Sequence, residues 1–422
     1  MDTSKATTII GCFLIHLIIG TIYSTGNIMP YIVSYLHLYS SSLTNSSMSI
    51  LFYICVLSFT FSFHLAAYLT TKFSLKKSIY IGNTIFVSVL FISSFTTNPL
   101  AMIIVYGFFL GVGAGISYIP ALMISLNCYP NNRGLITGVI ICAFGLGSFF
   151  FNFVASFTAN PNDSKPQTYE VNGGSDKFFD ESVAMNVPLM FRVLGFCYMA
   201  VTILALFLIK DSELKEENNV KENVSIKSCF KSSPFYQIFF GILFSGTAGL
   251  FFVASFKTVG LQLSYDDGFL TIVGSIGSIF NGTSRIFWGI LIDKTSFKTT
   301  YTCILTFQVI LCLTFPLICN INYLFLIWTV IMFACLGGNY TLLPPIAIKL
   351  YGKITGVRIY AFFICSMGLA SIFVYFIQLY VIKFLGYDYL FLVLSGLSLC
   401  PFISNMFFEE NISQKDLQEK LV

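Results

Sequence analysis

The chain has 422 residues, of which 56% are hydrophobic and only 10% are charged. An ordinary soluble domain carries about 25% charged residues, so this composition excludes a soluble globular protein. The formal net charge is +4, from 23 Lys and Arg against 19 Asp and Glu, and no contiguous basic tract indicates nucleic-acid binding. The twelve cysteines are scattered singly, without metal-ligand spacing. We therefore expect an integral membrane protein with no metal site and no cofactor.

Hydropathy predicts twelve membrane-spanning helices, each of which needs about 20 apolar residues. The first six are expected over residues 7–33, 48–71, 78–95, 100–127, 134–158 and 187–210. The other six are expected over residues 235–262, 269–292, 299–318, 322–349, 355–383 and 388–408. The first span lacks a basic leader and a convincing cleavage site, so we expect it to be retained.

A polar, charge-rich stretch that begins at residue 211 (DSELKEENNVKENVSIK) separates the two sets of spans. Its composition is typical of a flexible connector. We therefore predict an N-terminal six-helix half (1–210), a cytoplasmic connector (211–233), a C-terminal six-helix half (234–408) and a cytoplasmic tail (409–422).

The distribution of basic residues predicts the orientation in the membrane. With both termini in the cytoplasm, 17 of the 23 Lys and Arg residues face that side, whereas the loop over residues 158–186 receives only Lys165 and Lys177. That loop also carries five acidic residues. No transit peptide is recognisable, so the plasma membrane is favoured, with an organellar membrane as the alternative.

A short internal repeat supports two related halves. The segment ITGVIICAF at residues 136–144 recurs as ITGVRIYAF at residues 354–362, with seven of nine positions identical. The two copies open the predicted fifth and eleventh helices, which is the register expected when helices one to six are repeated as seven to twelve. We therefore expect an all-α membrane protein with twelve helices in two pseudo-symmetric halves.

Arg285 lies in the middle of the predicted eighth span. Every Asp and Glu falls in a loop or at a helix end, so no carboxylate is expected at mid-membrane to neutralise it. Asn281, one turn earlier, can only form hydrogen bonds. An unneutralised guanidinium in a cavity binds an anion, and its fixed fork suits a carboxylate. We predict that Arg285 binds substrate; the alternative is that it bonds helix carbonyls and only joins the halves.

Three other titratable residues lie within predicted spans. Lys257, near the outer end of the seventh span, either extends to the lipid headgroups or takes part in an outer vestibule. We include Lys257 and Asn281 among the candidate substrate-binding residues. His16 and His64, in the first and second spans, could carry a coupled proton because imidazole titrates near neutrality. The alternative for each histidine is a hydrogen-bonded structural role.

Aromatic and small residues complete the set of candidates. Tyr23, Tyr118 and Tyr340 could supply hydroxyl donors and aromatic walls to a central cavity. Glycines in the fourth and fifth spans should let helix backbones approach closely. We find no Ser/His/Asp array and no paired-carboxylate site, so we do not expect an enzyme. The glycines are residues 107, 111, 113, 115, 138, 145 and 147.

Several stretches resemble a known family of transporters. Gly289, Asp293 and Lys294 resemble the GxxxD[RK]xG[RK] signature that follows helix eight in the major facilitator superfamily. The equivalent between helices two and three is degraded, because Thr71 stands where an acid is expected. GVGAGISYIPA, YPNNRGLITGVIICAFGLGSFFFN and GGNYTLLP look like the oxalate:formate antiporter branch and the related monocarboxylate porters. We group Arg133, within the second stretch, with the gating motif.

The resemblance implies alternating access around a site at the membrane midplane. Arg285 looks like the helix-eight substrate arginine, and the three tyrosines fall where aromatic cavity residues are expected. The bacterial oxalate exchanger has a lysine just before a helix-eleven glycine, whereas here Met367 precedes Gly368. One cation in place of two favours a monoanion over a dianion, since a second carboxylate would be buried without a partner.

We therefore predict a secondary transporter of a small organic monocarboxylate such as pyruvate, lactate or formate. The alternatives are a transporter of a larger acid such as pantothenate, a dicarboxylate exchanger, and a non-transporting sensor with the same fold. The expected partners are the substrate anion, a coupled proton and the lipid bilayer.

Overall fold

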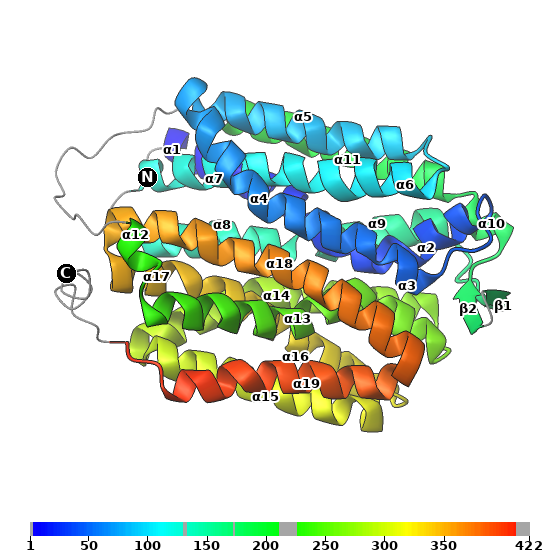
Figure 1. The fold of residues 1–422 in the computed structure, drawn as a ribbon. Coiled ribbons are helices and arrows are strands. Elements are labelled where there is room, and N and C mark those ends of the chain that lie inside the picture. The colour runs from blue at the N-terminus through cyan, green and yellow to red at the C-terminus, as the bar shows by residue number, and fades with distance from the viewer. Residues whose placement is uncertain (1–2, 130–132, 172–173, 211–225, 411–422) are drawn as a thin grey trace.

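The structure is a computed structural model that describes residues 3–129, 133–171, 174–210 and 226–410. It is helical apart from one antiparallel hairpin (Figure 1). The elements of the first part of the chain are α1 (Thr3–Ile19), η1 (Gly20–Ser24), α2 (Thr25–His37), α3 (Asn45–Met48), α4 (Ile50–Lys72), α5 (Leu75–Ser93), α6 (Pro99–Met102), η2 (Ile103–Phe109), α7 (Leu110–Cys128), α8 (Arg133–Leu146), α9 (Ser148–Ala159), β1 (Gln167–Val171), β2 (Gly174–Phe178), α10 (Glu181–Ala184) and α11 (Val187–Leu208). The later elements are α12 (Ile226–Cys229), α13 (Ser233–Gln262), α14 (Asp267–Lys294), α15 (Phe297–Ile318), α16 (Asn322–Thr341), α17 (Leu343–Tyr351), α18 (Lys353–Leu385) and α19 (Tyr387–Met406).

Eleven helical segments of the described chain are long and apolar enough to cross a membrane, and they follow the predicted spans in order. The predicted eighth span corresponds to α14, which is not among the eleven although it has 28 residues. At 1.5 Å per residue such a helix is about 42 Å long, which is sufficient to span a bilayer. Its lower hydropathy reflects polar residues such as Asn281 and Arg285. The predicted all-α membrane fold is therefore confirmed.

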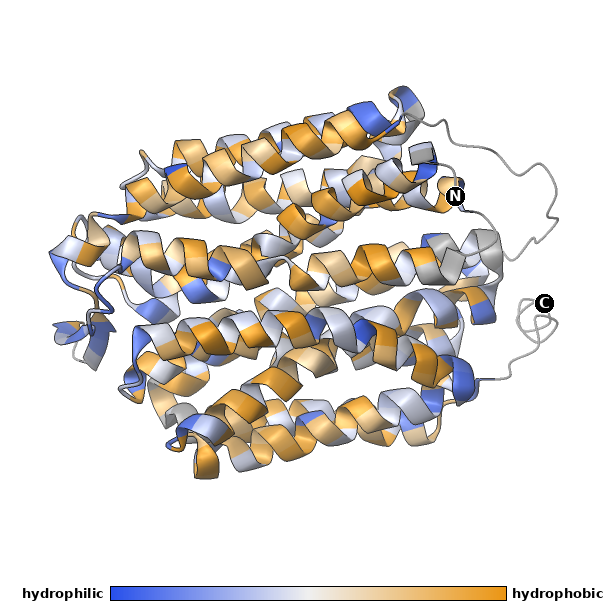
Figure 2. Ribbon diagram, turned by 180° about the vertical axis from the view of Figure 1, so that it is seen from behind, coloured by the Kyte–Doolittle hydropathy of each residue, from blue (hydrophilic) through white to orange (hydrophobic). Residues whose placement is uncertain are grey.

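The two sets of helices lie side by side, with the helices up to α11 above and those from α13 onward below in Figure 1. The N-terminus, α12 and α17 lie at one end of the bundle, which we call the connector end. The hairpin β1–β2 and α10 lie at the opposite end, which we call the hairpin end. Hydrophilic residues gather at both ends, and the helix middles are mostly hydrophobic (Figure 2). The expected connector and tail lie largely outside the described residues.

The halves meet along three seams, where α2 packs on α13, α8 and α9 pack on α14, and α4 packs on α18. Glycines set the close approach at the first two. A Cβ on Gly145 would collide with the backbone of Gly282, and one on Gly26 would collide with the Val253 carbonyl. The expected close packing is confirmed for Gly145 but not for Gly138, which has nothing within 4 Å of such a Cβ. Within the first half, it is also confirmed at positions 107, 111, 113, 115 and 147.

Several spans are interrupted near the middle of the bundle. The 3₁₀ turn η1 separates α1 from α2, Gly147 separates α8 from α9, and Leu342 separates α16 from α17. Pro344 and Pro345, which cannot donate backbone hydrogen bonds, lie two and three residues after the last break. Such interruptions inside membrane helices are tolerated where protein or a cavity covers the backbone, and they often mark functional positions.

The contact between Gly145 and Gly282 generates a stability prediction. Gly145→Ala adds a methyl group against the Gly282 backbone, so we expect overpacking to lower the free energy of unfolding by about 1–3 kcal/mol. Gly138→Ala is the matched control, because open space faces that position and alanine favours helix by up to about 1 kcal/mol. Thermal unfolding of the purified protein in detergent measures both. Equal stability of the two variants would contradict the proposed seam.

Candidate functional site

Arg285 lies in α14 at the seam between the halves and is only 3% exposed. Its guanidinium carbon is 5.6 Å from the centre of the Phe144 ring on α8 and 5.5 Å from that of Tyr340 on α16. The ion pairs among the described residues involve Lys165, Lys257 and Lys349 instead. The structure therefore holds Arg285 as a buried cation faced by aromatic rings and not by a carboxylate.

Asn281 orients this guanidinium. Arg285 Nε donates to the Asn281 backbone carbonyl at 3.3 Å, and Nη2 donates to Asn281 Oδ1 at 3.0 Å. Asn281 Nδ2 in turn donates to the Phe333 carbonyl at 3.1 Å, which fixes the amide. A guanidinium has five N–H groups, so these two bonds leave others for a ligand. The alternative role for Arg285, in which it only joins the halves, predicted a hydrogen bond to a helix carbonyl. That bond is present, to the Asn281 carbonyl, but it uses only one of the five N–H groups.

The structure brings the three predicted tyrosines together around Arg285. The side chain of Tyr23, on η1, interacts with both Arg285 and Tyr340. Tyr118, on α7, is 5% exposed and lies edge-on to Phe144 with 5.4 Å between ring centres. Phe144 also packs edge-on against Tyr23 at 5.5 Å. Arg285 thus lies in a cage of aromatic rings that can exclude water while offering phenolic hydroxyls.

Two residues of this cage escaped the sequence analysis. Phe144 belongs to the first copy of the internal repeat, and Tyr360 belongs to the second. Tyr360 is close enough to Arg285 and Tyr118 for electrostatic interaction. The repeat aligns Tyr360 with Cys142, which also lies within electrostatic range of Arg285. Placing both copies of the internal repeat at the contact between the halves would have identified Phe144 and Tyr360 as candidates.

The two predicted histidines occupy different environments. His16 is completely buried, its ring centre lies 4.7 Å from that of Tyr118, and its Nδ1 is 3.1 Å from the Cys12 carbonyl. Its Nε2 is buried without a hydrogen-bond partner. His64 is exposed on α4 and contacts Cys365 of α18, with 3.6 Å between Nε2 and Sγ. His16 therefore adjoins the aromatic cage, whereas His64 lies at the seam between α4 and α18.

The residues of the predicted gating motif lie toward the connector end of α14. Asp293 and Lys294 are exposed in its last turn, and a Cβ on Gly289 would be 3.8 Å from Thr341. The side chain of Arg133 lies outside the described residues. Over the described ranges, no group of three or more His, Cys, Asp or Glu side chains could hold a metal ion.

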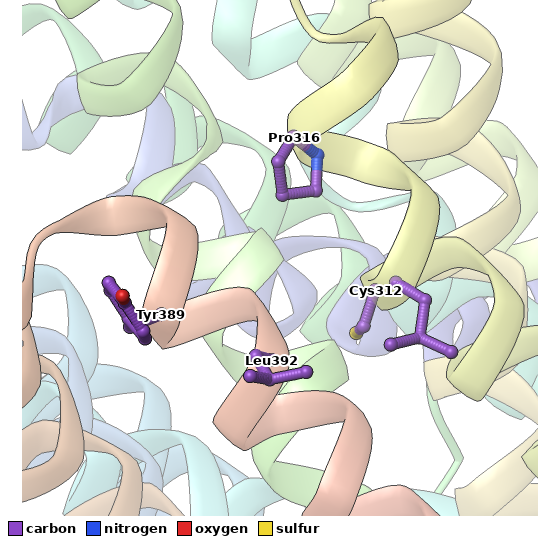
Figure 3. Close-up of a pocket in the computed structure, with 5 residues that line it drawn as sticks. Cys312, Pro316, Tyr389 and Leu392 are labelled. Carbon is purple, nitrogen blue, oxygen red and sulfur yellow. The ribbon is translucent and has the colours of Figure 1, made fainter.

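Two grooves on the outside of the bundle do not belong to this site. One, of about 240 Å³, lies between α15 and α19 and is lined by Cys312, Leu313, Pro316, Tyr389 and Leu392 (Figure 3). The other, of about 270 Å³, lies between α13 and α19 beside Pro401. Their apolar linings and outward position indicate surfaces that face lipid.

The interrupted helices, the two facing halves and the caged cation can be compared with known proteins. Residues 11–358 match the sequence profile of the Major Facilitator Superfamily. The chain belongs to the Major Facilitator Superfamily. Solved members show the same fold: the nucleoside transporter NupG has a TM-score of 0.65 at 14% identity, with 96% of this chain and 99% of that chain covered. A point mutant of NupG gives a TM-score of 0.67 at 14% identity, covering 94% and 99% of the two chains.

Curated relatives within the superfamily are named as carriers of organic acids. Apicoplast pyruvate carrier 1 of Toxoplasma gondii is 21% identical over 444 aligned residues, which cover 86% of this chain and 81% of the carrier. The oxalate:formate antiporter of Oxalobacter formigenes is 25% identical, covering 62% of this chain and 59% of the antiporter. Apicoplast pyruvate carrier 2 of Toxoplasma gondii is 23% identical, covering 49% and 37%. These relatives and the solved structures are transporters, consistent with a protein that is not an enzyme.

Lys257 lies in a buried ion pair, so the alternative in which it extends to the lipid headgroups is wrong, whereas its role in an outer vestibule stays a prediction. It is 0% exposed, and its Nζ lies 2.8 Å from Asp267 Oδ1 at the start of α14. Asp267 is at a helix end, as expected, but it is also buried within the bundle. Nζ also donates to Tyr31 at 2.8 Å and to Asn27 at 3.1 Å, both on α2. A sequence scan missed the pair because its carboxylate falls outside the apolar stretch of either helix.

This network crosses the seam between the halves. Asp267 accepts hydrogen bonds from Tyr31 and, at 3.0 Å, from Asn160. Tyr31 and Asn160 belong to the first half, whereas Lys257 and Asp267 belong to the second. The buried charges therefore neutralise each other within one half while neutral polar groups of the other half bond to them.

The pair yields a second stability prediction. Lys257→Met leaves the Asp267 carboxylate buried without a cation, so we expect the free energy of unfolding to fall by about 3–5 kcal/mol. Adding Asp267→Asn removes the unpaired charge and should restore part of that loss. Thermal unfolding in detergent measures both variants. If Lys257→Met alone is as stable as the unmodified chain, the buried pair is not as described.

Proposed function

We propose that this superfamily member is a secondary transporter that moves a small organic monocarboxylate across a membrane by alternating access. The observation that carries the proposal is the buried Arg285, which has N–H groups free of Asn281 and no ion pair among the described contacts. A bound carboxylate would neutralise this charge and accept two parallel hydrogen bonds from the guanidinium. In this proposal the substrate supplies the carboxylate partner that Arg285 lacks among the described residues.

The surroundings of Arg285 support a monoanion. Met367, where the bacterial oxalate exchanger has a lysine, is 0% exposed and packs against Gly246 of α13. A dianion would therefore place its second carboxylate among aromatic rings without a cation, which is costly. The names of the relatives, two pyruvate carriers and an oxalate:formate antiporter, support substrates of this chemical class.

We also propose the orientation of the protein and its membrane. The excess of Lys and Arg places the connector end in the cytoplasm. The sequence alone favours the plasma membrane, whereas the word apicoplast in the names of two relatives supports the organellar alternative. Fluorescence microscopy of the tagged chain in its own cell distinguishes the two.

Arg285→Gln tests the substrate site. In liposomes containing the purified protein, uptake of radiolabelled pyruvate, lactate, formate, oxalate and pantothenate is compared with and without internal substrate. Losing charge-assisted bonds worth about 1.5–3 kcal/mol should weaken the apparent affinity for a monocarboxylate by about 10- to 100-fold.

Arg358→Gln is the matched control for that experiment, because Arg358 is exposed on α18. Normal uptake by Arg285→Gln would refute the proposed role of Arg285. Preferential uptake of oxalate or pantothenate would contradict a small monocarboxylate as the substrate and favour a dicarboxylate or a larger acid instead. No uptake of the five acids by folded protein would favour the sensor alternative.

For the coupled proton we propose His16, since its unpartnered Nε2 lies beside Tyr118 at the aromatic cage. We expect His16→Gln to abolish stimulation of uptake by an imposed pH gradient while exchange against internal substrate continues. His64→Gln serves as the control and should keep the stimulation. The proposal fails if the two variants respond alike to the gradient.

A further inference from the structure

At the hairpin end, side chains of one half bind the other half in a set of contacts that we call the clasp. One side of the clasp is the loop that follows α9, residues 160–171 and 174–180, which we call the latch segment. The other side is the turn between α13 and α14, residues 263–266, with the helix ends that flank it. Charged side chains of the latch segment bind both helix ends.

Lys177 of the latch segment binds the end of α13. Its Nζ donates to the carbonyls of Leu261 and Gln262 at 2.9 and 3.1 Å, and to Ser264 Oγ at 2.9 Å. An ammonium has three N–H donors, and each has an acceptor here. The last carbonyls of a helix lack partners within the helix and carry the negative end of its dipole, so a cation stabilises them. Partial burial lowers the pKa of Lys177.

Asp163 of the latch segment binds the start of α14. Its Oδ1 accepts a hydrogen bond from the backbone N–H of Gly268 at 2.7 Å. Asp266, the residue at the capping position of α14, makes no capping bond and pairs with Lys165 instead. A residue of the first half thus replaces the helix's own cap and places a carboxylate at the positive end of its dipole.

The hairpin adds a third tie across the same junction. Asp176, which is 8% exposed, accepts hydrogen bonds from the backbone and side chain of Asn45 at 2.7 and 3.0 Å. It also accepts from Gln262 Nε2 at 2.9 Å. The hairpin therefore connects the start of α3 to the end of α13.

The backbone is strained on both sides of this clasp. Among the described residues, Asp163 and Ser264 are the two non-glycine residues with positive φ, at 50° and 65°. Left-handed backbone is unfavourable for residues with a Cβ and persists where surrounding contacts hold it. Asp163 supplies the carboxylate for α14, and Ser264 supplies a hydroxyl acceptor for Lys177. Both residues with positive φ thus supply a side chain to a contact that joins the halves.

We propose that the latch segment is the gate of the hairpin end: Asp163 and Lys177 hold the turn between α13 and α14, and their release opens the central site to that side. This rests on the alternating access proposed above. The Lys257–Asp267 network adjoins the clasp, because Lys257 lies five residues before the end of α13 and Asp267 is next to Gly268. The halves can therefore separate at this network only after the clasp is released. Because both buried charges belong to one half, opening leaves that ion pair whole. Strain at Asp163 and Ser264 reduces the cost of release.

Hydrogen exchange of the full chain in lipid nanodiscs tests the gate without requiring a substrate. Losing the three hydrogen bonds that the Lys177 ammonium donates should accelerate exchange by about tenfold or more in Lys177→Gln, with a larger effect when Asp163→Ala is added. The decisive readout is exchange at residues 27–34 and 150–158 of the first half, which the clasp does not cap. Lys349→Gln, which removes an ion pair of an exposed lysine at the connector end, is the matched control and should change little.

Several outcomes would overturn the gate. Faster exchange confined to residues 261–268 would mean that the latch segment only caps two helix ends. An equal response in Lys349→Gln would indicate a nonspecific charge effect, and unchanged exchange in Lys177→Gln would refute the gate. Lys177→Arg keeps the cation and should retain protection, which separates loss of the clasp from misfolding. Failure of substrate uptake would refute the proposed function and leave these exchange results standing.

Discussion

A buried guanidinium without a carboxylate partner is the constraint around which this bundle is organised. Removing an ion from water costs several kcal/mol, and a mid-membrane arginine persists only where bonds or a bound anion compensate. Here the compensation is incomplete, because Asn281 accepts two bonds and aromatic rings supply the rest of the contact. The residual positive charge at the centre of the molecule is the basis of the proposal that an organic anion binds there.

The second buried cation shows the opposite solution. Lys257 is neutralised by Asp267 and surrounded by hydroxyl and amide groups from both halves. The contacts of this ion pair join α13 and α14 to α2 across the seam. The cost of burying a cation is therefore offset by a carboxylate of the protein at the hairpin end, whereas no carboxylate among the described residues pairs with Arg285 at the centre.

Small residues and interrupted helices bring the aromatic side chains to Arg285. Backbone contact between Gly145 and Gly282 brings α8 to α14, which places Phe144 over Arg285. Breaks in the first and tenth spans lie next to Tyr23 and Tyr340 in the chain, so the tyrosines project from helix ends toward the seam. A regular helix in either position would direct these side chains according to its 3.6-residue period instead.

The sequence by itself determined the membrane class, the order of the spans, the internal repeat and the presence of a cation, Arg285, within an apolar span. These follow from local properties, since hydropathy over about 20 residues and a charge within an apolar run need no knowledge of neighbouring helices. Only the tertiary structure decided the state of Lys257, the inclusion of Tyr360 in the cage, the separation of His16 from His64, and the capping of α14 by Asp163. Each depends on which side chain of another helix or loop comes within about 3–6 Å, and that is set by how helices pack and not by the spacing of residues along one of them.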